Sequence, residues 1–472
     1  MVFNEWMSTE SAPLSYEELL VENERLRLKL LELQEREEKL QRLLRRDSTN
    51  SSQAPSQDKR SKPKRKRKKS KRKPGGQPGH AGKTREALPS DKVTRQITCE
   101  LAARCATCGH DGVRERGVRV QQVVDLNEVV ELLLSTGRCA GCRKRRTATR
   151  PDGYTASVVG SKLLSFVGYS TGILGVSRRR VVRMLDEVFD IQLSLGTVSW
   201  REAEIAAALE PPCEEIKDAI GDAEALHLDE TGQRKCGGRV TAWVASTLSF
   251  TAMFLGRRRD RRTLMSIIRR NGKKPFSGVM ITDRYKVYDI DEKRQLCLEH
   301  LRRNFLALAC ENGIIGDVSR RCTSAVRRVL IAWRDHRARC IDTARYTSIV
   351  QRCRRRIEAE LTRAWTAQGP MLLAELKTLT YAFFLDGHSI WRFVDDKKVE
   401  PTNNRGERDI REYVLRRKVS LHTWSDRGDL YLERTLSVAG TCRKQGMSPF
   451  AFLQNAVWAL RTSTPAPRLL AA

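Results

Sequence analysis

The stretch Ala225-Leu226-His227-Leu228-Asp229-Glu230-Thr231-Gly232 is a short apolar run that ends in two carboxylates. A strand of this kind carries an acidic side chain to the rim of a core, where loss of hydration costs free energy unless something compensates it. A second apolar run, Gly278–Asp283, ends in an aspartate in the same way, and the helix-like segment Asn403–Arg408 has a glutamate near its start. Three carboxylates that converge on one point form a divalent-metal site. We therefore expect these three stretches to meet.

The residues between the first two carboxylates predict strands and one helix. Residues 239–255 are rich in β-forming side chains, and residues 260–270 have helical spacing with Leu264, Ile267 and Ile268 on one face. Three strands, a helix and a strand that ends in aspartate are typical of an RNase H-like sheet, whose first and fourth strands are neighbours. This order predicts an α/β catalytic core, expected over residues 222–312 and 400–462, with Asp229 and Asp283 side by side.

The segment that begins at residue 403 is predicted to be a helix that carries the third carboxylate. Glu407, Arg411 and Lys418 fall on one helical face at steps of four and seven residues. The helix would thereby bring a carboxylate to the metal and two cations to phosphate. Asp409 and Glu412 are alternatives for the third carboxylate, but neither shares the face of Arg411 and Lys418.

The charge of the chain indicates a polyanionic partner. Lysine and arginine number 88 against 57 aspartates and glutamates, a net charge of +31, and Lys59–Lys73 supplies 12 of these charges. Because the remaining excess is spread along the chain, nucleic acid is the natural partner. No stretch approaches the roughly 20 apolar residues that a membrane span needs, so we expect a cytoplasmic protein without membrane contact.

The N-terminal part is predicted to be a coiled coil followed by a basic arm. Residues 15–46 carry leucines at positions 19, 26, 33 and 40, and Asn23 at an inner position favours a dimer in register. A homodimer or larger assembly is expected; the alternative is an amphipathic helix packed on its own chain. Residues 47–90 are polar and then densely basic, which predicts a disordered arm that contacts phosphates without reading sequence. The alternative is a solvated linker.

Paired cysteines predict a zinc-binding module over residues 91–152. The candidate ligands are Cys105, Cys108, Cys139 and Cys142, which form two C-x-x-C pairs. Four thiolates at this spacing can surround Zn²⁺ tetrahedrally, and Cys99 and His110 are spare or substitute ligands. Free thiols are the alternative. A site closed by four protein ligands would serve folding and DNA docking.

Two further regions have helical spacing. Residues 160–212 predict two helices around a short break at residues 191–195, as in a helix-turn-helix DNA-binding region; plain helical packing is the alternative. Residues 313–399 predict a helical insertion with one apolar stripe from Tyr346 to Trp365, broken at Gly369-Pro370. Asn403 or Asn404 would then cap the helix of the third carboxylate.

Several motifs together carry a specific resemblance to a known family. They are GGQPGH (75–80), the paired cysteines, LHLDET (226–231), DRYKVY (283–288), CLEHLRR (297–303) and NNRGER (403–408) with Arg417-Lys418. Through these motifs nearly the whole chain resembles the large transposase of the insertion sequence 66 family, a DDE transposase. The resemblance implies an RNase H-like core, dependence on Mg²⁺ and the catalytic triad Asp229, Asp283 and Glu407. The chain departs from the family at Arg284, where glycine is usual.

The chemistry implied is cleavage and transfer of DNA strands. Two Mg²⁺ ions, for which Mn²⁺ can substitute, would be shared by Asp229 and held by Asp283 and Glu407. Water would free a 3′-hydroxyl at the element's end, and this hydroxyl would attack target DNA. The candidates for phosphate contact are His300, Arg303, Arg411 and Lys418, each of which has a plain surface or core-rim role as the alternative.

Double-stranded DNA, both element ends and target, is the expected partner. Members of the family are commonly encoded together with small accessory proteins, so such proteins of the same element are further expected partners. The expected location is the bacterial cytoplasm, at the nucleoid. Two other functions remain open: an inactive, transposase-derived DNA-binding repressor, and an RNase H-like nuclease. The repressor would bind DNA with or without Mg²⁺ and never nick it, whereas the nuclease would cut strands but never join them.

Overall fold

The computed structural model describes residues 86–236, 238–290, 293–420 and 423–470, together with a few residues between Val21 and Leu33. The chain divides into two compact units, Met1–Ala81 and Gly82–Ala472. Residues 47–85 of the predicted basic arm and most of the predicted coiled coil lie outside the described residues. The coiled-coil residues that are described are helical, and Leu26, Leu30 and Leu33 among them are exposed. The dimer and the arm therefore stay predictions, as do the domain boundaries inside the second unit.

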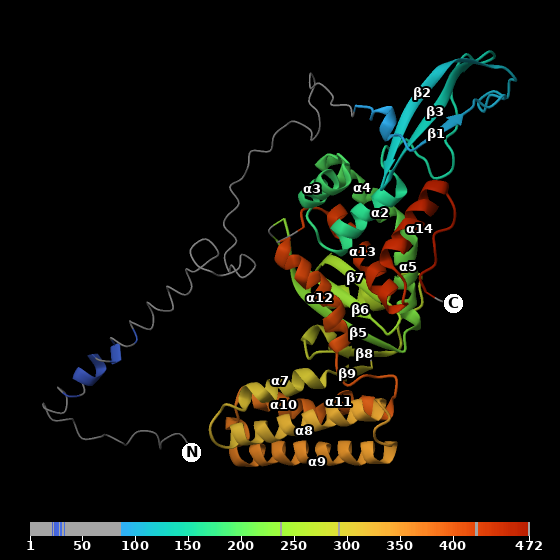
Figure 1. The fold of residues 1–472 in the computed structure, drawn as a ribbon. Helices are drawn as coiled ribbons and strands as arrows, with labels where there is room; N and C mark the ends of the chain where they lie inside the picture. The colour runs from blue at the N-terminus through green and yellow to red at the C-terminus, as the bar shows by residue number, and fades with distance from the viewer. Residues whose placement is uncertain are drawn as a thin grey trace, which may run out of the picture. The chain divides into compact units, whose positions relative to one another are not determined.

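A long antiparallel hairpin organises the region of the paired cysteines (Figure 1). Strand β2 (Val113–Asp125) pairs with β3 (Glu128–Cys139), and Asn127 adopts a positive φ of 65° in the two-residue turn between them. The flanking elements are η2 (Ser90–Lys92), β1 (Arg95–Cys99), which is parallel to β3, and β4 (Arg145–Thr147), which is antiparallel to β3. Because Val113 pairs with Cys139, both cysteine pairs lie at the end of the hairpin opposite the turn.

A group of helices follows the hairpin. They are α2 (Ser161–Gly168), the π-helical turn η3 (Tyr169–Ile173), α3 (Arg178–Phe189), α4 (Leu195–Ala208), α5 (Glu210–Asp218) and η4 (Ala219–Asp222). The predicted break between two helices is confirmed: α3 ends at Asp190 in the left-handed conformation, and Ser194 caps α4 by accepting a hydrogen bond from the Thr197 amide over 3.0 Å. Arg178 and Glu202 connect the two helices through a hydrogen bond of 2.9 Å.

The centre of the fold is a mixed five-stranded sheet. Its strands are β5 (Ala225–Lys235), β6 (Gly238–Ser246), β7 (Thr251–Arg257), β8 (Val279–Thr282) and β9 (Arg294–Leu296), with helix α6 (Arg261–Ile268) between β7 and β8 and the short η5 (Lys286–Tyr288) after β8. The strand order is β7-β6-β5-β8-β9. Strand β6 is antiparallel to both of its neighbours, β7 and β5, whereas β5, β8 and β9 run parallel to one another. The expected neighbourhood of the first and fourth strands is confirmed.

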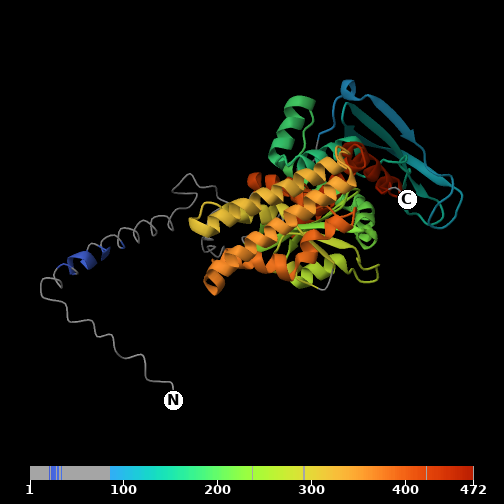
Figure 2. The ribbon, with the colours of Figure 1, turned by 90° about the horizontal axis from the view of Figure 1, so that it is seen from below.

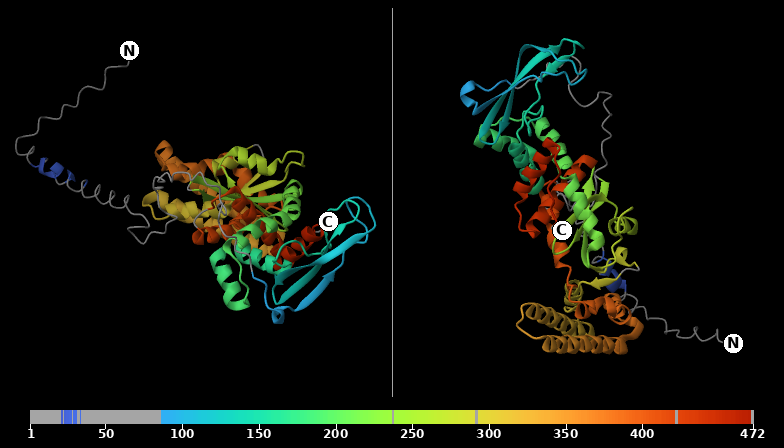
Figure 3. Two further views of the ribbon diagram at one scale, coloured as in Figure 1. Left: turned by 90° about the horizontal axis from the view of Figure 1, so that it is seen from above. Right: turned by 90° about the vertical axis from the view of Figure 1, so that its right-hand side faces the viewer.

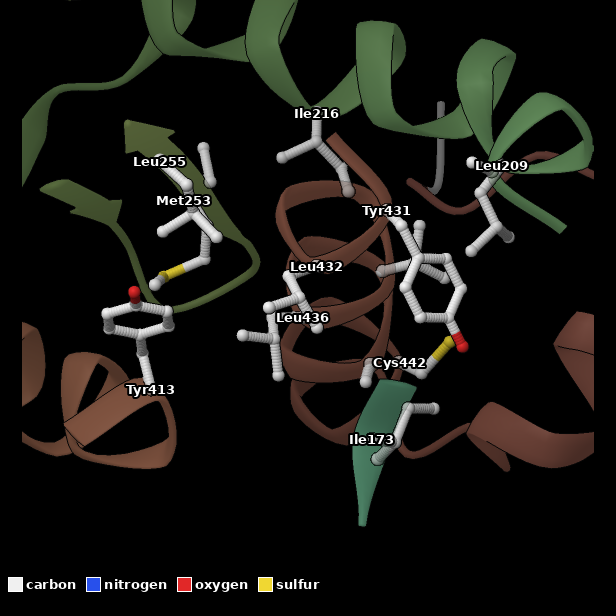
Figure 4. Packing of buried hydrophobic residues seen from close by; sticks show 14 of the residues in the cluster. Ile173, Leu209, Ile216, Met253, Leu255, Tyr413, Tyr431, Leu432, Leu436 and Cys442 are labelled. Atoms are coloured by element: carbon white, nitrogen blue, oxygen red, sulfur yellow. The ribbon is translucent and has the colours of Figure 1, made fainter. Parts of the chain in front are cut away.

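Helices from the C-terminal part return to this sheet: α12 (Asn404–Val419), α13 (Asp426–Lys444) and α14 (Pro449–Thr462). Helix α13 is buried over most of its surface between Asp429 and Cys442. Figure 4 shows its Tyr431, Leu432 and Leu436 among side chains of β7, α5 and α12. A helix buried on nearly all faces is fixed from several directions. The residues after position 400 are therefore held against strands formed near residue 250.

The predicted helical insertion, residues 313–399, is present as a stack of helices, and the preceding helix α7 (Leu298–Leu308) packs against it. The helices of the insertion are α8 (Gly313–Arg337), α9 (Thr343–Gln368), η6 (Gly369–Met371), α10 (Ala374–Leu385) and α11 (Gly387–Asp395). Five members of the predicted stripe, Tyr346, Val350, Cys353, Ile357 and Leu361, are buried in a core shared with β8 and β9. Figures 1 and 2 show α8 and α9 lying lengthwise against each other. Among the described residues no helix is both long and apolar enough to cross a membrane.

Candidate active site

Asp229 and Asp283 belong to neighbouring parallel strands. The pairing of β5 with β8 runs from Ala225 opposite Val279 to His227 opposite Ile281. The same register continued by two residues sets Asp229 opposite Asp283, just beyond the end of β8. Each carboxylate is oriented by the backbone that follows it, since Asp229 accepts from the Glu230 amide and Asp283 from the Tyr285 amide, both over 2.9 Å. The predicted neighbourhood of the two aspartates is therefore present in the sheet. Strand β5 does not end at Asp229 as expected, because it continues to Lys235 through its pairing with β6.

Negative charge accumulates around Asp229. Burial is the largest cause that raises the pKa of Asp229, to about 7, and the nearby charges of Glu230, Asp283 and Glu407 act in the same direction. The described residues give Asp229 no ion pair. Burial and neighbouring negative charges both disfavour the ionised form of a carboxyl group. A cation among these carboxylates would therefore stabilise the ionised form of Asp229.

Glu230, the second carboxylate of the decisive stretch, is already engaged. It accepts a hydrogen bond of 2.6 Å from Arg259 and a further one from the Tyr288 hydroxyl, and its side chain is 2% exposed. Arg259 in turn stacks over the ring of Tyr285, 3.8 Å from its centroid. Glu230 therefore serves a structural pairing, which leaves Asp229 as the carboxylate of this strand that is free to act as a metal ligand.

Glu407 lies in the first turn of α12 and faces α7. Its Oε1 atom accepts from Arg303 over 3.0 Å and lies 3.5 Å from Nδ1 of His300. Burial lowers the pKa of His300, and the positive charge of Arg303 adds to this, so the imidazole is held neutral. The buried Nδ1 atom of His300 has no hydrogen-bond partner. Two of the four candidates for phosphate contact thus lie beside the third carboxylate.

Arg411 and Lys418 continue along the same helix. Steps of four and eleven residues from Glu407 turn an α-helix by roughly 40° and 20°, so both side chains leave α12 near the direction of Glu407. Both are exposed, and the structure records no ion pair for either within the described part of the chain. They are available to an external anion but lie one and three turns from the carboxylate.

The side chain of Asn403 does not cap α12, contrary to expectation. Asn403 occupies the N-cap position, but no hydrogen bond runs from its side chain to the helix. Instead its Nδ2 donates to the carbonyl of Leu228 over 2.7 Å, and its Oδ1 lies 3.2 Å from Nδ1 of His227. Burial lowers the pKa of His227 to about 4, so this imidazole is neutral and donates to Oδ1. Asn403 therefore fastens the helix of Glu407 to the strand of Asp229.

The same residue also holds the start of α7. The backbone amide of Asn403 donates to Sγ of Cys297 over 3.1 Å. Cys297, His300 and Glu407 present ligand atoms within 4.8 Å of one another, a set that could hold a soft metal ion. However, burial raises the pKa of Cys297 to about 11, and a protonated thiol that already accepts a hydrogen bond is a poor ligand. We interpret Cys297 as a structural contact.

The alternatives for the third carboxylate have structural partners. Asp409 accepts from Thr251 over 2.9 Å and from Lys444 over 2.5 Å, which joins α12 to β7 and α13. Glu412 accepts from Arg443 over 2.6 Å. These contacts favour Glu407 as the carboxylate of the site.

Arg284, the departure from the family pattern, is turned toward the helical insertion. It donates to the carbonyl of Thr378 in α10 over 3.3 Å. Its guanidinium group thus connects the end of β8 to the insertion, and the structure records no ion pair between it and the carboxylates of the site within the described residues. A bulky cation at this position is consistent with an intact set of metal ligands.

The four paired cysteines form a compact cluster. Sγ of Cys105 lies 3.8 Å from that of Cys142, Sγ of Cys108 lies 3.6 Å from that of Cys139, and all four lie within 4.8 Å of one another. A tetrahedral Zn²⁺ with Zn–S bonds of about 2.3 Å requires S–S separations of about 3.8 Å. The cluster therefore fits zinc.

The two spare candidates stand apart from this cluster. Cys99 is buried in the core of the hairpin sheet, and the side chain of His110 lies against Gly141. Neither residue belongs to the group of thiols that could hold the metal. The four cysteines alone fill the tetrahedral coordination of zinc, so a substitute ligand has no place in it.

The class of protein that these features define is a mixed α/β protein with a carboxylate-lined site where the parallel pairing of β5 and β8 ends. Comparison with known families gives a match to "Transposase IS66 family" over residues 156–429, more than half of the chain. The chain belongs to the IS66 family of transposases. Residues 8–86 match a separate family of unknown function, DUF6444.

Two curated relatives come from Sinorhizobium fredii (strain NBRC 101917 / NGR234). Uncharacterized protein y4qI is 27% identical over 210 residues, which cover 41% of this chain and 38% of the relative. Uncharacterized protein y4hP is 22% identical over 410 residues, which cover 79% of this chain and 73% of the relative. The match therefore spans well under half the length of the first relative and about three quarters of the second.

Proposed function

We propose that this chain is a DNA transposase that binds the ends of its insertion sequence and catalyses Mg²⁺-dependent strand cleavage and strand transfer into target DNA. One observation carries the proposal: the register of β5 and β8 sets Asp229 opposite Asp283, and Asn403 joins the helix of Glu407 to the same strand. The strand order, with three antiparallel strands followed by two parallel ones, supports an RNase H-like core. Family membership supports the same chemistry.

The donor set fits magnesium. Asp229, Asp283 and Glu407 offer hard carboxylate oxygens, and the raised pKa of Asp229 reflects negative charge that a cation would balance. When bound, two Mg²⁺ or Mn²⁺ ions would supply activation of the attacking oxygen and stabilisation of the leaving oxygen. Asp229 would be the shared ligand, with Asp283 and Glu407 each holding one ion.

The other residues of the site would position the DNA. Arg303 pairs with Glu407 at present and would contact a phosphate when the carboxylate turns to a metal. The neutral His300 would donate a hydrogen bond to the same phosphate, and Arg411 with Lys418 would extend the contact along α12. In cleavage, a water oxygen bonds to phosphorus, the bond to the 3′ oxygen breaks, and that oxygen takes up a proton. In joining, the freed 3′-hydroxyl attacks a target phosphate and displaces another 3′ oxygen.

The remaining parts of the chain would serve binding and assembly. Residues 15–46 would form a homodimer or larger assembly, the basic arm would contact phosphates, and the cysteine module with Zn²⁺ and the α3–α4 pair would dock on duplex DNA. Small accessory proteins of the same element would take part. The place of action would be the bacterial nucleoid.

The decisive experiment offers the full-length protein labelled DNA that bears the element's ends, with Mg²⁺ and a target plasmid. Strand joining is expected. Glu407→Gln removes the charge that holds one ion, so cleavage and joining should fall by roughly a thousandfold or more while DNA binding persists, since a metal supplies several kcal/mol to the transition state. The matched control is Glu412→Gln on the same helix, whose partner is Arg443. It should retain most of the activity.

Other outcomes separate the alternatives. Cleavage without joining would support an RNase H-like nuclease. Binding that is identical with and without Mg²⁺, and that never leads to a nick, would support a DNA-binding repressor. Loss of joining in Glu412→Gln together with its retention in Glu407→Gln would move the third carboxylate to a different face of α12.

A further inference from the structure

A groove lined by arginine runs between α8 and α9 of the helical insertion. It has a volume of about 330 Å³. Its lining residues are Ser324, Ala325, Arg328, Arg345, Ser348, Ile349, Arg352, Cys353 and Arg356. Four of these nine side chains are cationic and none is acidic. Because the guanidinium groups repel one another, a groove of this composition is suited to an anionic ligand.

The ion pairs of the two helices lie outside the groove. Helices α8 and α9 carry twelve arginines and four carboxylates. Each carboxylate is paired with an arginine outside the groove: Asp317 with Arg320 at 3.1 Å, Asp335 with Arg334 at 3.0 Å, Glu358 with Arg354 at 2.9 Å and Glu360 with Arg363 at 2.7 Å. The four arginines of the groove have no ion pair within the described residues. Their charge is therefore left for an external partner.

The spacing of these arginines suits a charged polymer. Arg345, Arg352 and Arg356 lie on one face of α9, and a rise of 1.5 Å per residue separates the outer two by about 16 Å along the helix. One strand of duplex DNA carries about five phosphates over that length. Below the guanidinium groups, Cys353 is buried and Ile349 packs on the core of the insertion, so the groove has a fixed apolar floor.

The groove lies away from the carboxylate site. In Figures 1 and 3, α9 is on the side of the insertion opposite the central sheet, with α7 and α10 nearer to the strands. Asp229 follows the parallel part of β5, and Glu407 faces α7. A ligand held between α8 and α9 would consequently contribute binding energy without entering the chemistry.

We propose that the α8–α9 groove binds the phosphate backbone of duplex DNA at a second place, remote from the carboxylates. The inference rests on the proposed function, in that the chain acts on DNA. Arginine contacts to phosphate position a duplex but carry no sequence information. The groove therefore holds DNA of any sequence, as target DNA or as DNA that flanks the cleaved end.

The test compares two double variants of the full-length chain that remove the same charge from α9. Arg352→Ala with Arg356→Ala removes two of the four arginines of the groove. Arg354→Ala with Arg363→Ala removes two arginines outside it, which are paired with Glu358 and Glu360. Affinity for a 30-base-pair duplex is measured against KCl concentration without divalent metal. The slope of log K against log [salt] is negative, and removal of one arginine–phosphate contact should reduce its magnitude by about 0.9. The slope of the groove variant should fall by about 1.8, and that of the control should change by less than about half of the value for one contact.

Equal reductions in the two variants would overturn the proposal, since both would then report only net charge. An unchanged slope in the groove variant would overturn the proposal as well. The proposal would also fail if that variant bound polyglutamate more weakly but bound DNA as the parent does, because the groove would then hold a different polyanion. Arg352→Lys with Arg356→Lys keeps the charges and should keep the slope. Because the readout needs neither metal nor strand joining, a protein that fails to join strands still tests the groove, and a failure of the groove leaves the carboxylate site untouched.

Discussion

The side-chain nitrogen of Asn403 donates a 2.7 Å hydrogen bond to the backbone carbonyl of Leu228, the residue immediately before Asp229. Asn403 is 1% exposed and lies 175 positions from Leu228 in the chain. Its backbone carbonyl also accepts from the Glu407 amide over 3.1 Å. One residue thus links the first and third carboxylates, and the geometry of the site depends on it.

Replacing Asn403 by alanine should damage both stability and activity. The change removes the hydrogen bonds of the Asn403 side chain to the Leu228 carbonyl and to Nδ1 of His227 in a buried place, which should cost about 1–3 kcal/mol of unfolding free energy. Strand cleavage should fall further than stability, because α12 loses its link to β5. Urea unfolding and single-turnover cleavage measure the two effects. Asn404→Ala, at an exposed neighbouring position, should stay within about 0.5 kcal/mol of the parent.

Gly406→Ala should be harmful although alanine favours helices by about 1 kcal/mol over glycine. A Cβ atom at position 406 would lie 2.9 Å from Oδ1 of Asn403, which would displace the amide from His227 and Leu228. The expected result is loss of stability and of cleavage. Gly428→Ala is the control, because its Cβ would be 3.4 Å from the nearest atom near the start of α13. Stabilisation by both alanines would contradict the role given to Asn403.

Magnesium affinity should depend on pH through Asp229. Its pKa is raised to about 7 in the metal-free protein, and the metal requires the ionised form. Below pH 7 the proton competes with the ion, so affinity should weaken up to about tenfold per pH unit, and above pH 7 it should level off. Calorimetry at about pH 6 in buffers of different ionisation enthalpy should detect proton release on binding. Asp229→Asn should abolish that release. A flat affinity between about pH 6 and 8 would argue against Asp229 as a ligand.

The cysteine cluster should carry about one zinc per chain. Cys105→Ser with Cys139→Ser removes one thiolate from each pair, so the metal content should drop to near zero and the hairpin should lose heat stability. Cys310→Ser is the matched control, because Cys310 is exposed and lies outside the cluster. Elemental analysis of freshly purified protein gives the ratio. Absence of zinc from the unmodified chain would refute the assignment.

Much of the local structure could be predicted from sequence. Short apolar runs followed by an aspartate located β5 and β8, and the helical spacing of Leu264, Ile267 and Ile268 located the helix between β7 and β8. The stripe from Tyr346 to Trp365 located α9, because a period of 3.6 residues marks the face that a helix must bury. The clustering of the C-x-x-C pairs could be predicted because the spacing itself restricts the geometry of the thiols. These features depend on residues that are close in the chain.

The tertiary structure decided which polar side chains remain available. Sequence placed Glu230 beside Asp229 and offered Asp409 and Glu412 with Glu407. In the folded chain Glu230 forms an ion pair with Arg259, and Asp409 forms one with Lys444. Glu407 lies beside α7, where it pairs with Arg303. The side chain of Asn403 bonds to the Leu228 carbonyl of β5 and not to the end of its own helix. The sequence by itself determined the elements and their apolar faces, since these follow from local periodicity. The partners of buried polar groups come from distant elements, and only folding brings those elements within hydrogen-bonding distance.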